Sequence, residues 1–215
     1  TKRTGFQVAH FRRTGFSVSA EFEDELYIEG DELTAEVTAE YLSGGRVNNG
    51  TFEMYWSKEG SGFSPPGGGY DGYRFGPDEY GTRFGLSSED GPLPSDGTVE
   101  TTQRTLLDGV PGLPYRYRLE ARISDVSNQI RASEISTLVH PASFYIGGRI
   151  EDARGGWYTF LEQGRKAACE LVVIDPLGAE VPDAGAPGEI EAELYRVTWK
   201  LARQQGVAGR ITCPR

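Results

Sequence analysis

Histidine, cysteine and methionine are scarce in this chain of 215 residues, which holds two His, two Cys and one Met. A Ser-His-Asp hydrolase needs a histidine base, and only His10 and His140 are available, both of which we interpret as structural. Cys169 and Cys213 are too few for a disulfide framework and lack the CxxC spacing of zinc and redox sites. We therefore predict no enzyme activity, no metal and no cofactor.

Long hydrophobic runs and an excess of positive charge are also missing. No run of about 18 apolar residues could span a bilayer, and the chain starts at Thr1 without a basic and apolar leader. We expect a piece of a longer chain whose targeting segment lies elsewhere. Lys and Arg number 22 against 32 Asp and Glu, a net charge of -10 that repels phosphate groups and anionic lipids. The sequence thus predicts no nucleic-acid partner and no membrane contact by this segment.

Aromatic residues, glycine and proline are plentiful, with 11 Tyr, 10 Phe, 29 Gly and 12 Pro, and this composition favours strands and turns over helices. Polar and apolar residues alternate, as in strands with one buried face. The alternating stretches are residues 16–22, 33–41, 52–56, 115–123 and 135–139. We interpret 33–41 and 52–56 as antiparallel neighbours joined by the polar turn 43–50. The predicted fold class is all-β, with tandem antiparallel β-sandwich modules of immunoglobulin-like or fibronectin-like type.

Between residues 57 and 114 the alternation gives way to Gly, Pro, Asp and Tyr. An irregular loop of this length in a compact domain is usually functional or flexible. Its aromatic residues would either form a sugar-stacking or protein-binding surface or fold the loop back over its own sheet, which is the reading we prefer. The candidate interaction residues are Phe63, Tyr70, Tyr73, Phe75, Tyr80 and Phe84.

Acidic residues in the same loop are interpreted as solvated charge rather than a calcium site, since the Asp-x-Asp-x-Asp-Gly pattern is absent. They are Asp71, Asp78, Glu79, Glu89, Asp90 and Asp96. Carboxylate pairs such as Glu21 and Glu23 lie two apart on one face of a strand, and the alternation makes that face the solvated one. A glycosidase pair would need a cleft and unequal environments, which the sequence does not indicate.

The second half of the chain repeats the pattern of the first half at a constant offset of 134 residues. The paired positions are Gly30 with Gly164, Leu33 with Ala167, Ala35 with Cys169, Val37 with Leu171, Ala39 with Val173, Gly44 with Gly178 and Val47 with Val181. Because turn and core positions agree together, we interpret the halves as duplicated modules. Cys169 is then expected on an inward face as a small buried hydrophobe, and a disulfide to Cys213 stays open.

The predicted boundary between the modules follows His140, because 140–142 has the composition of a linker. Residues 1–140 are predicted to form the first sandwich, with its long loop at 57–114, and residues 141–215 the second. The second copy has about 75 residues, short beside the roughly 100 of a seven-stranded sandwich. We expect it to be truncated or to be completed by sequence beyond Arg215.

Three groups of residues stand in a characteristic order and spacing. They are Phe-Ser-Val at 16–18, Tyr-Ile-Glu-Gly-Asp at 27–31 and Ala-Glu-Tyr-Leu-Ser-Gly-Gly-Arg-Val at 39–47. They resemble the macroglobulin-like domains of the alpha-2-macroglobulin family, in particular its bacterial branch. The resemblance extends through 138–145 and on to Trp199, over most of the chain. Each motif alone occurs in many sandwiches, so their order and spacing carry the resemblance.

The resemblance implies a scaffold segment, itself non-catalytic, of a large exported protein that inhibits many endopeptidases by trapping them. In that family, strings of sandwiches frame a cleavable bait segment, and bacterial members are periplasmic and often lipid-anchored. Proteases would then be partners of the intact protein, and neighbouring domains of the same chain would be direct partners, with the two modules meeting near 140–144. The family's thioester needs Cys-x-x-Gln, and the nearest match, Phe160 to Gln163, has no nucleophile at Phe160.

Two other functions remain open at this stage. A tandem immunoglobulin-like array of a cell-surface adhesin would use the Gly- and Tyr-rich loop to contact a ligand. A sandwich-bearing carbohydrate enzyme would use the loop aromatics as sugar subsites. A downstream Cys-x-x-Gln and a protease-sensitive segment in the full-length sequence would favour the trap, whereas long identical repeats would favour the adhesin.

Overall fold

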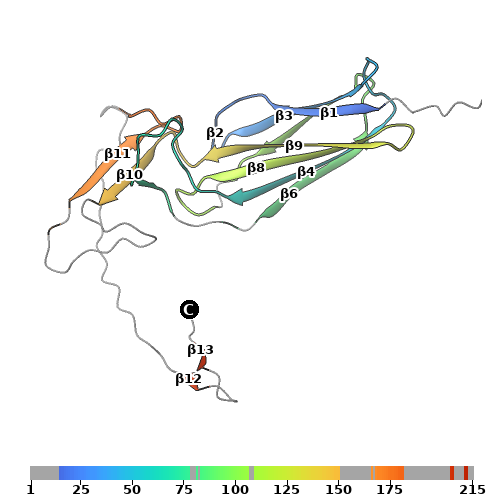
Figure 1. Ribbon diagram of the computed structural model, residues 1–215. Coiled ribbons are helices and arrows are strands. Elements are labelled where there is room, and N and C mark those ends of the chain that lie inside the picture. The colour runs from blue at the N-terminus through green and yellow to red at the C-terminus, as the bar shows by residue number, and fades with distance from the viewer. Residues whose placement is uncertain are drawn as a thin grey trace, which may run out of the picture. The chain divides into compact units, whose positions relative to one another are not determined.

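The computed structural model describes residues 15–77, 81, 83–106, 109–150, 166 and 168–181, and the backbone of 204–205 and 211–212. These residues form strands and their connections, with no helix among them, so the all-β fold class is confirmed (Figure 1). The chain divides into two compact units, residues 1–181 and 182–215. In the second unit the described strands β12 (Gln204–Gln205) and β13 (Ile211–Thr212) pair antiparallel.

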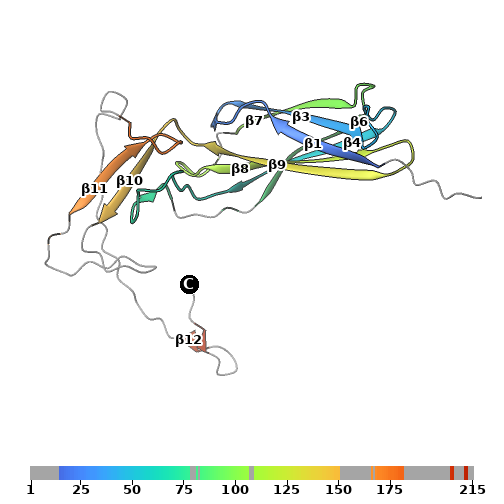
Figure 2. The same cartoon turned by 45° about the horizontal axis from the view of Figure 1, so that its top comes forward.

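Two sheets make up the first sandwich, and Figures 1 and 2 show them as layers. The smaller sheet has the order β1-β3-β7, from β1 (Phe16–Phe22), β3 (Glu32–Tyr41) and β7 (Thr98–Arg104). The larger sheet has the order β2-β9-β8-β4-β6, from β2 (Tyr27–Ile28), β9 (Ile130–His140), β8 (Tyr115–Ser124), β4 (Thr51–Gly60) and β6 (Phe84–Pro92). All neighbours pair antiparallel except β2 and β9, which are parallel.

The core of the sandwich lies between the inward faces of these sheets. In β3 and β8 the alternating apolar residues face the core and most are buried, with Leu33 and Leu119 both at 0% exposure. Trp56 of β4 adds the largest buried side chain, and its indole Nε1 donates a hydrogen bond to the Thr101 hydroxyl at 3.2 Å. That bond satisfies the one polar atom of the indole, so the ring fills the core without an unpaired donor.

The predicted pairing of 33–41 with 52–56 is wrong. β3 pairs with β1 and β7, whereas β4 pairs with β6 and β8, so the two strands lie in different sheets. The connection between them is nine residues long, and its first half folds back on β3 through a bridge between Glu40 and Arg46. A connection of this length can cross from one layer to the other, which the two-residue turn of a tight hairpin cannot do.

The predicted irregular loop at 57–114 is also corrected, because it contains β6, β7 and the end of β4. β6 escaped detection because it is a sheet edge, exposed along most of its length and without apolar alternation. β7 does alternate, but one of its inward residues is Thr101, which a hydrophobic pattern passes over. Residues 61–77 do remain largely irregular, with only β5 (Arg74–Phe75) among them.

A third sheet follows the sandwich along the chain, in the order β11-β10-β5. β10 (Tyr145–Ile150) pairs antiparallel with β11 (Cys169–Ile174) on one side and with β5 on the other. β5 therefore belongs by sequence to the loop of the first sandwich and by hydrogen bonding to the sheet that follows it. The described residues include no helix long and apolar enough to cross a membrane.

Candidate functional site

The loop at 61–77 meets the third sheet in a cluster of rings, here called the aromatic joint. Its members are Phe63, Tyr70, Tyr73, Phe75, His140 and Tyr145. Ile174 of β11 lies fully buried against these rings, at 0% exposure. The joint thus has its own small hydrophobic core, separate from the core of the first sandwich.

Phe63 lies at the centre of the joint. Its ring stacks on Tyr145 with the planes 6° apart and the centroids at 3.7 Å. It also meets Phe75 edge to face at 5.9 Å and His140 edge to face at 5.7 Å. Stacked and edge-to-face pairs each stabilise by about 0.5–1.5 kcal/mol beyond the burial of the ring area. One loop residue therefore connects the end of β9, the start of β10 and the strand β5.

His140 ends β9 and is buried, so it is part of the structured joint rather than of a linker. Its Nδ1 lies 2.7 Å from the Tyr145 hydroxyl. Burial lowers the pKa of His140 and raises the pKa of Tyr145 well above its usual value. Both groups are therefore neutral near pH 7, and the hydroxyl can donate to Nδ1. This hydrogen bond holds the end of β9 against the start of β10. It does not place a nucleophile beside a base.

A polar contact closes the edge of the joint. The Tyr73 hydroxyl donates to a Glu170 carboxylate oxygen at 3.0 Å, and this bond raises the pKa of Tyr73. Arg149 forms an ion pair with the same carboxylate, and its guanidinium lies 4.8 Å from the centre of the Tyr73 ring. Tyr73 belongs to the loop, whereas Arg149 and Glu170 belong to β10 and β11. The contact therefore ties the loop to both strands of the hairpin.

Two glycines, one in β10 and one in the turn after β11, allow the loop to approach closely. A Cβ at Gly147 would clash with the Phe75 ring, since Phe75 of β5 lies opposite Gly147 in the antiparallel pair with β10. A Cβ at Gly178 would lie 2.8 Å from the carbonyl oxygen of Pro66, and the Gly178 carbonyl accepts a hydrogen bond from the Tyr70 hydroxyl at 2.9 Å. Larger residues at either position would push the loop away.

The structure brings together four of the six candidate interaction residues. Phe63 and Phe75 are buried, at 8% exposure each, and Tyr70 and Tyr73 are half-buried. Phe84 lies apart from them at the start of β6, with 52% of its surface exposed. Tyr80 is outside the described residues. The loop therefore packs on the sheet that follows it. The preferred prediction, that the loop folds back over its own sheet, is wrong for these four residues.

Sequence reasoning missed the partners of these rings. Tyr145, Arg149 and Glu170 were not singled out, although the sequence did place the meeting of the modules near 140–144. A signal was present in the neighbouring ring-bearing residues His140 and Tyr145. It could not be used, because nothing in the sequence says that residues 61–77 reach that point.

The expectation that Cys169 lies in a core is wrong. Cys169 lies exposed on β11. The face of β11 that packs against the joint carries Val172 and Ile174, and Cys169 points to the opposite face with Leu171. Cys213 and His10 lie outside the described residues, so a bridge between the two cysteines stays untested.

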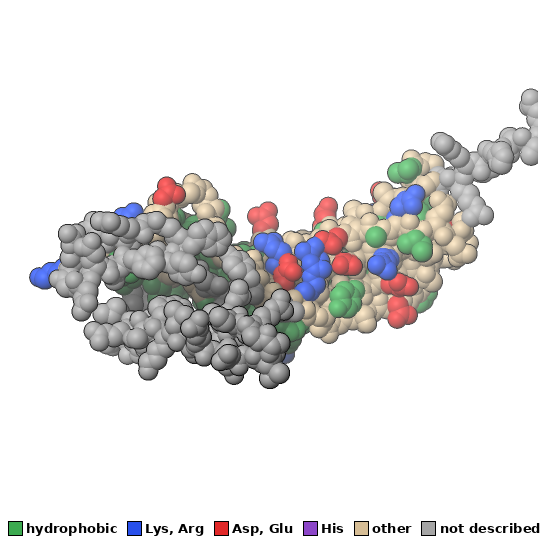
Figure 3. Space-filling view, turned by 60° about the horizontal axis from the view of Figure 1, so that its bottom comes forward, with side chains coloured by type: hydrophobic (Ala, Val, Ile, Leu, Met, Phe, Trp, Pro, Cys, Tyr) green, Lys and Arg blue, Asp and Glu red, His purple; other side chains and the backbone are tan. Residues whose placement is uncertain are grey.

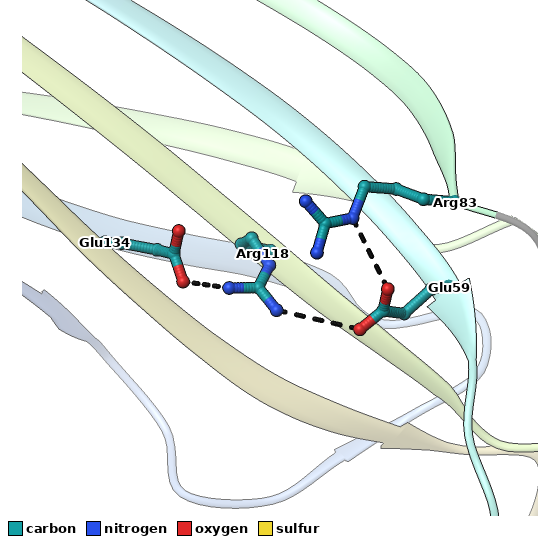
Figure 4. A network of polar contacts seen from close by, with 4 residues as sticks. All are labelled: Glu59, Arg83, Arg118 and Glu134. Carbon is teal, nitrogen blue, oxygen red and sulfur yellow. Dashed lines mark hydrogen bonds and ion pairs between the residues drawn. The ribbon is translucent and has the colours of Figure 1, made fainter.

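The outward face of the larger sheet carries a chain of ion pairs. Arg118 of β8 pairs with Glu134 of β9, and its other terminal nitrogen lies 3.6 Å from Glu59 of β4. Glu59 also accepts from Arg83, just before β6, at 3.3 Å (Figure 4). Side chains of both signs are interspersed in the space-filling view (Figure 3). Such pairs add little to stability individually, because their side chains are partly solvated.

A shallow hollow of about 400 Å³ lies beside this chain of ion pairs. It is lined by acidic residues together with Tyr55 and Arg122. Among the residues that the structure describes, no three His, Cys, Asp or Glu side chains come together so as to hold a metal ion. Asp78 and Glu79 of the candidate acidic set are outside that part of the chain.

Comparison with known proteins gives a consistent result. The chain is 24% identical over 206 residues to an alpha-2-macroglobulin homolog from a Nostoc species, covering 93% of this chain and 10% of that protein. Escherichia coli alpha-2-macroglobulin activated by porcine elastase superposes with a TM-score of 0.59 at 17% identity, over 78% of this chain and 15% of that one. The chain has the macroglobulin-domain fold. The predicted resemblance to the bacterial alpha-2-macroglobulins is confirmed.

A second structure supports the same fold. Salmonella alpha-2-macroglobulin reacted with methylamine superposes with a TM-score of 0.58 at 16% identity, over 80% of this chain and 12% of that one. No family model matches the chain. The chain spans only about a tenth of the length of the curated relative. The similarity therefore concerns one macroglobulin-like segment and not the whole of that protein.

Proposed function

We propose that this chain is a structural scaffold segment, itself non-catalytic, of a bacterial alpha-2-macroglobulin-like protease trap. The observation that carries the proposal is the aromatic joint, which fixes a loop of one sandwich to the sheet that follows it along the chain. Successive domains can frame a bait segment, or transmit a movement after its cleavage, only if they hold one another through specific contacts. Phe63, β5 and the Tyr73 to Glu170 bond are contacts of that kind.

The non-catalytic part of the proposal rests on the chemistry of the described side chains. His140 is buried against Tyr145, so it is committed to a structural hydrogen bond and not to a nucleophile. Protease partners are inferred through the intact protein, since the structural neighbours include Escherichia coli alpha-2-macroglobulin activated by elastase and by trypsin. We also propose that the intact protein lies in the periplasm or cell envelope, as the resemblance to the bacterial family members implies.

The adhesin alternative would use the Gly- and Tyr-rich loop to contact a ligand. Two rings of that loop, Phe63 and Phe75, are buried in the joint, and Tyr70 and Tyr73 are half-buried, so the exposed ring surface that a ligand could contact is reduced. The carbohydrate-enzyme alternative depended on the same exposed rings. Measurable glycan hydrolysis by this chain would nevertheless contradict the non-catalytic proposal.

The trap is tested on the full-length protein that contains this chain. Elastase is added in equal amount, the hydrodynamic radius is followed by light scattering, and elastase activity is measured on a large protein substrate and on a small peptide. We expect the radius to change on cleavage and activity to be lost on the large substrate only. An unchanged radius together with full activity on the large substrate would show that the protein is no trap.

The role of this segment is tested by a matched pair of variants in the same protein. Phe63→Ala removes the central ring of the joint, whereas Phe84→Ala removes an exposed ring of the same type. We expect Phe63→Ala to weaken the change of radius and Phe84→Ala to leave it unaltered. Equal behaviour of the two variants would remove the joint from the mechanism while leaving the trap itself in place.

A further inference from the structure

Two turns that lie 134 residues apart in the sequence have the same backbone hydrogen bonds. In the first copy the Tyr41 amide donates to Gly45, the Gly44 amide to Tyr41 and the Val47 amide to Ala39, at 2.8–2.9 Å. In the second copy the same three bonds occur 134 residues later. They run from Asp175 to Ala179, from Gly178 to Asp175 and from Val181 to Val173, at 2.8–3.0 Å.

The backbone conformation of the two turns agrees at the first glycine but not at the next residue, where Gly45 has a φ of 89° and Ala179 has no positive φ. Gly44 and Gly178 have φ angles of 95° and 88°, a region that favours glycine. The bridge between Glu40 and Arg46 closes the first turn, and a bridge between Ile174 and Glu180 closes the second. The turn 41–47 and the turn 175–181 are therefore equivalent parts of two modules and can be compared residue by residue.

The two turns differ in what covers them. At Gly178, the space next to the α-carbon is filled by Pro65 and Pro66, and Tyr70 donates to its carbonyl. At Gly44 none of the residues that the structure describes comes within 4 Å of a Cβ built there. Pro176 is buried, whereas its counterpart Leu42 is 76% exposed. The second turn is covered around Gly178 by a loop of the preceding module, although its Leu177 remains 67% exposed. The equivalent first turn has no such cover at Gly44 from the described residues.

We propose that the turn 41–47 is a docking surface for a Pro-Pro-Gly loop bearing a tyrosine, of the kind found at 61–77, supplied by another macroglobulin-like module. The open space at Gly44 would accept a proline, the Gly44 carbonyl would accept a tyrosine hydroxyl, and Leu42 would lose its exposed surface. The occupant is inferred from the loop that covers the equivalent turn in this chain. The proposal is independent of protease trapping, because it rests on the repeat alone.

The test uses the whole chain, labelled with ¹⁵N, and a synthetic peptide with the sequence of residues 61–77 as the probe. Peptide is titrated while backbone amide shifts are recorded. We expect saturable shift changes at the amides of 42–47. A peptide in which the residue equivalent to Tyr70 is Phe should bind roughly 2- to 12-fold more weakly, because one hydrogen bond is lost.

Two variants of the chain complete the test. Leu42→Glu places a charge at the proposed surface, and Phe84→Glu places the same charge at another exposed apolar residue. We expect Leu42→Glu to abolish the shift changes and Phe84→Glu to leave them intact. Unfolding curves of both variants should show that each is still folded. Equal binding by the two variants would overturn the proposal.

Other occupants are separate outcomes of the same experiment. Shift changes confined to 175–181 would mean that the peptide only competes with the chain's own loop, and would overturn the proposal. Movement of the 42–47 amides on simple dilution, without peptide, would assign the turn to contacts between copies of this chain and would overturn it too. Absence of any shift up to the solubility limit of the peptide would have the same meaning.

Discussion

Replacing Phe63 by alanine should open the aromatic joint without unfolding the sandwich. Phe63 is only 8% exposed, and its ring stacks on Tyr145 and meets Phe75 and His140 edge to face. Buried Phe→Ala substitutions cost about 3–5 kcal/mol. We take the lower end, about 3 kcal/mol, because the joint is small and its loop can relax to fill part of the space.

The cost should fall on the joint alone, since the sandwich has a separate core. Native-state hydrogen exchange distinguishes the two regions. A loss of about 3 kcal/mol accelerates exchange roughly 100-fold, up to the limit set by the opening of the joint itself. We expect this acceleration at amides where β10 pairs with β5, such as Gly147 and Gly148, and none at Leu119 or Ala121 of β8.

Phe84→Ala is the control, because that ring is half exposed and makes none of the ring contacts seen in the joint. Phe84→Ala should change the free energy of opening, measured by exchange at Gly147 and at Leu119, by less than about 0.5 kcal/mol. Equal acceleration at Gly147 and Leu119 in the Phe63→Ala protein would show that joint and sandwich open together. Unchanged exchange at Gly147 would show that the stacked ring does not hold the loop in place, and the reasoning would be wrong.

Three further perturbations follow from the described contacts. The pKa of His140 is lowered in the folded state, so the folded protein binds fewer protons than the unfolded chain. The contribution of His140 to the free energy of unfolding should therefore be constant above about pH 6.5 and decrease below it. Urea titrations of His140→Asn should lack this decrease. Gly178→Ala should cost more than Gly44→Ala in thermal unfolding, because both pay about 1–2 kcal/mol for the left-handed backbone but only Gly178 meets Pro66. Arg118→Gln should cost about 1 kcal/mol or less, an effect that shrinks with added salt; a cost that does not change with salt would contradict an ion-pair origin.

Local patterning determined much of this fold. Alternation along 33–41 and 115–123 identified β3 and β8 and assigned their buried faces correctly, because the side-chain period of a strand depends only on the strand itself. The repeat likewise identified the turn at Gly44 and its equivalent at Gly178, since a left-handed residue in a tight turn requires glycine at that position. These features need no knowledge of what lies beside them.

Tertiary structure decided the pairing of strands and the faces that contacts cover. β3 and β4 follow one another in sequence but belong to different sheets. β7 pairs with β3, and its buried Thr101 accepts a hydrogen bond from Trp56, a partner far away in the sequence. The repeat predicted that Cys169 would be buried, yet the loop at 61–77 covers the other face of β11. Which face is buried depends on the element that packs against it, and that element comes from a distant part of the chain.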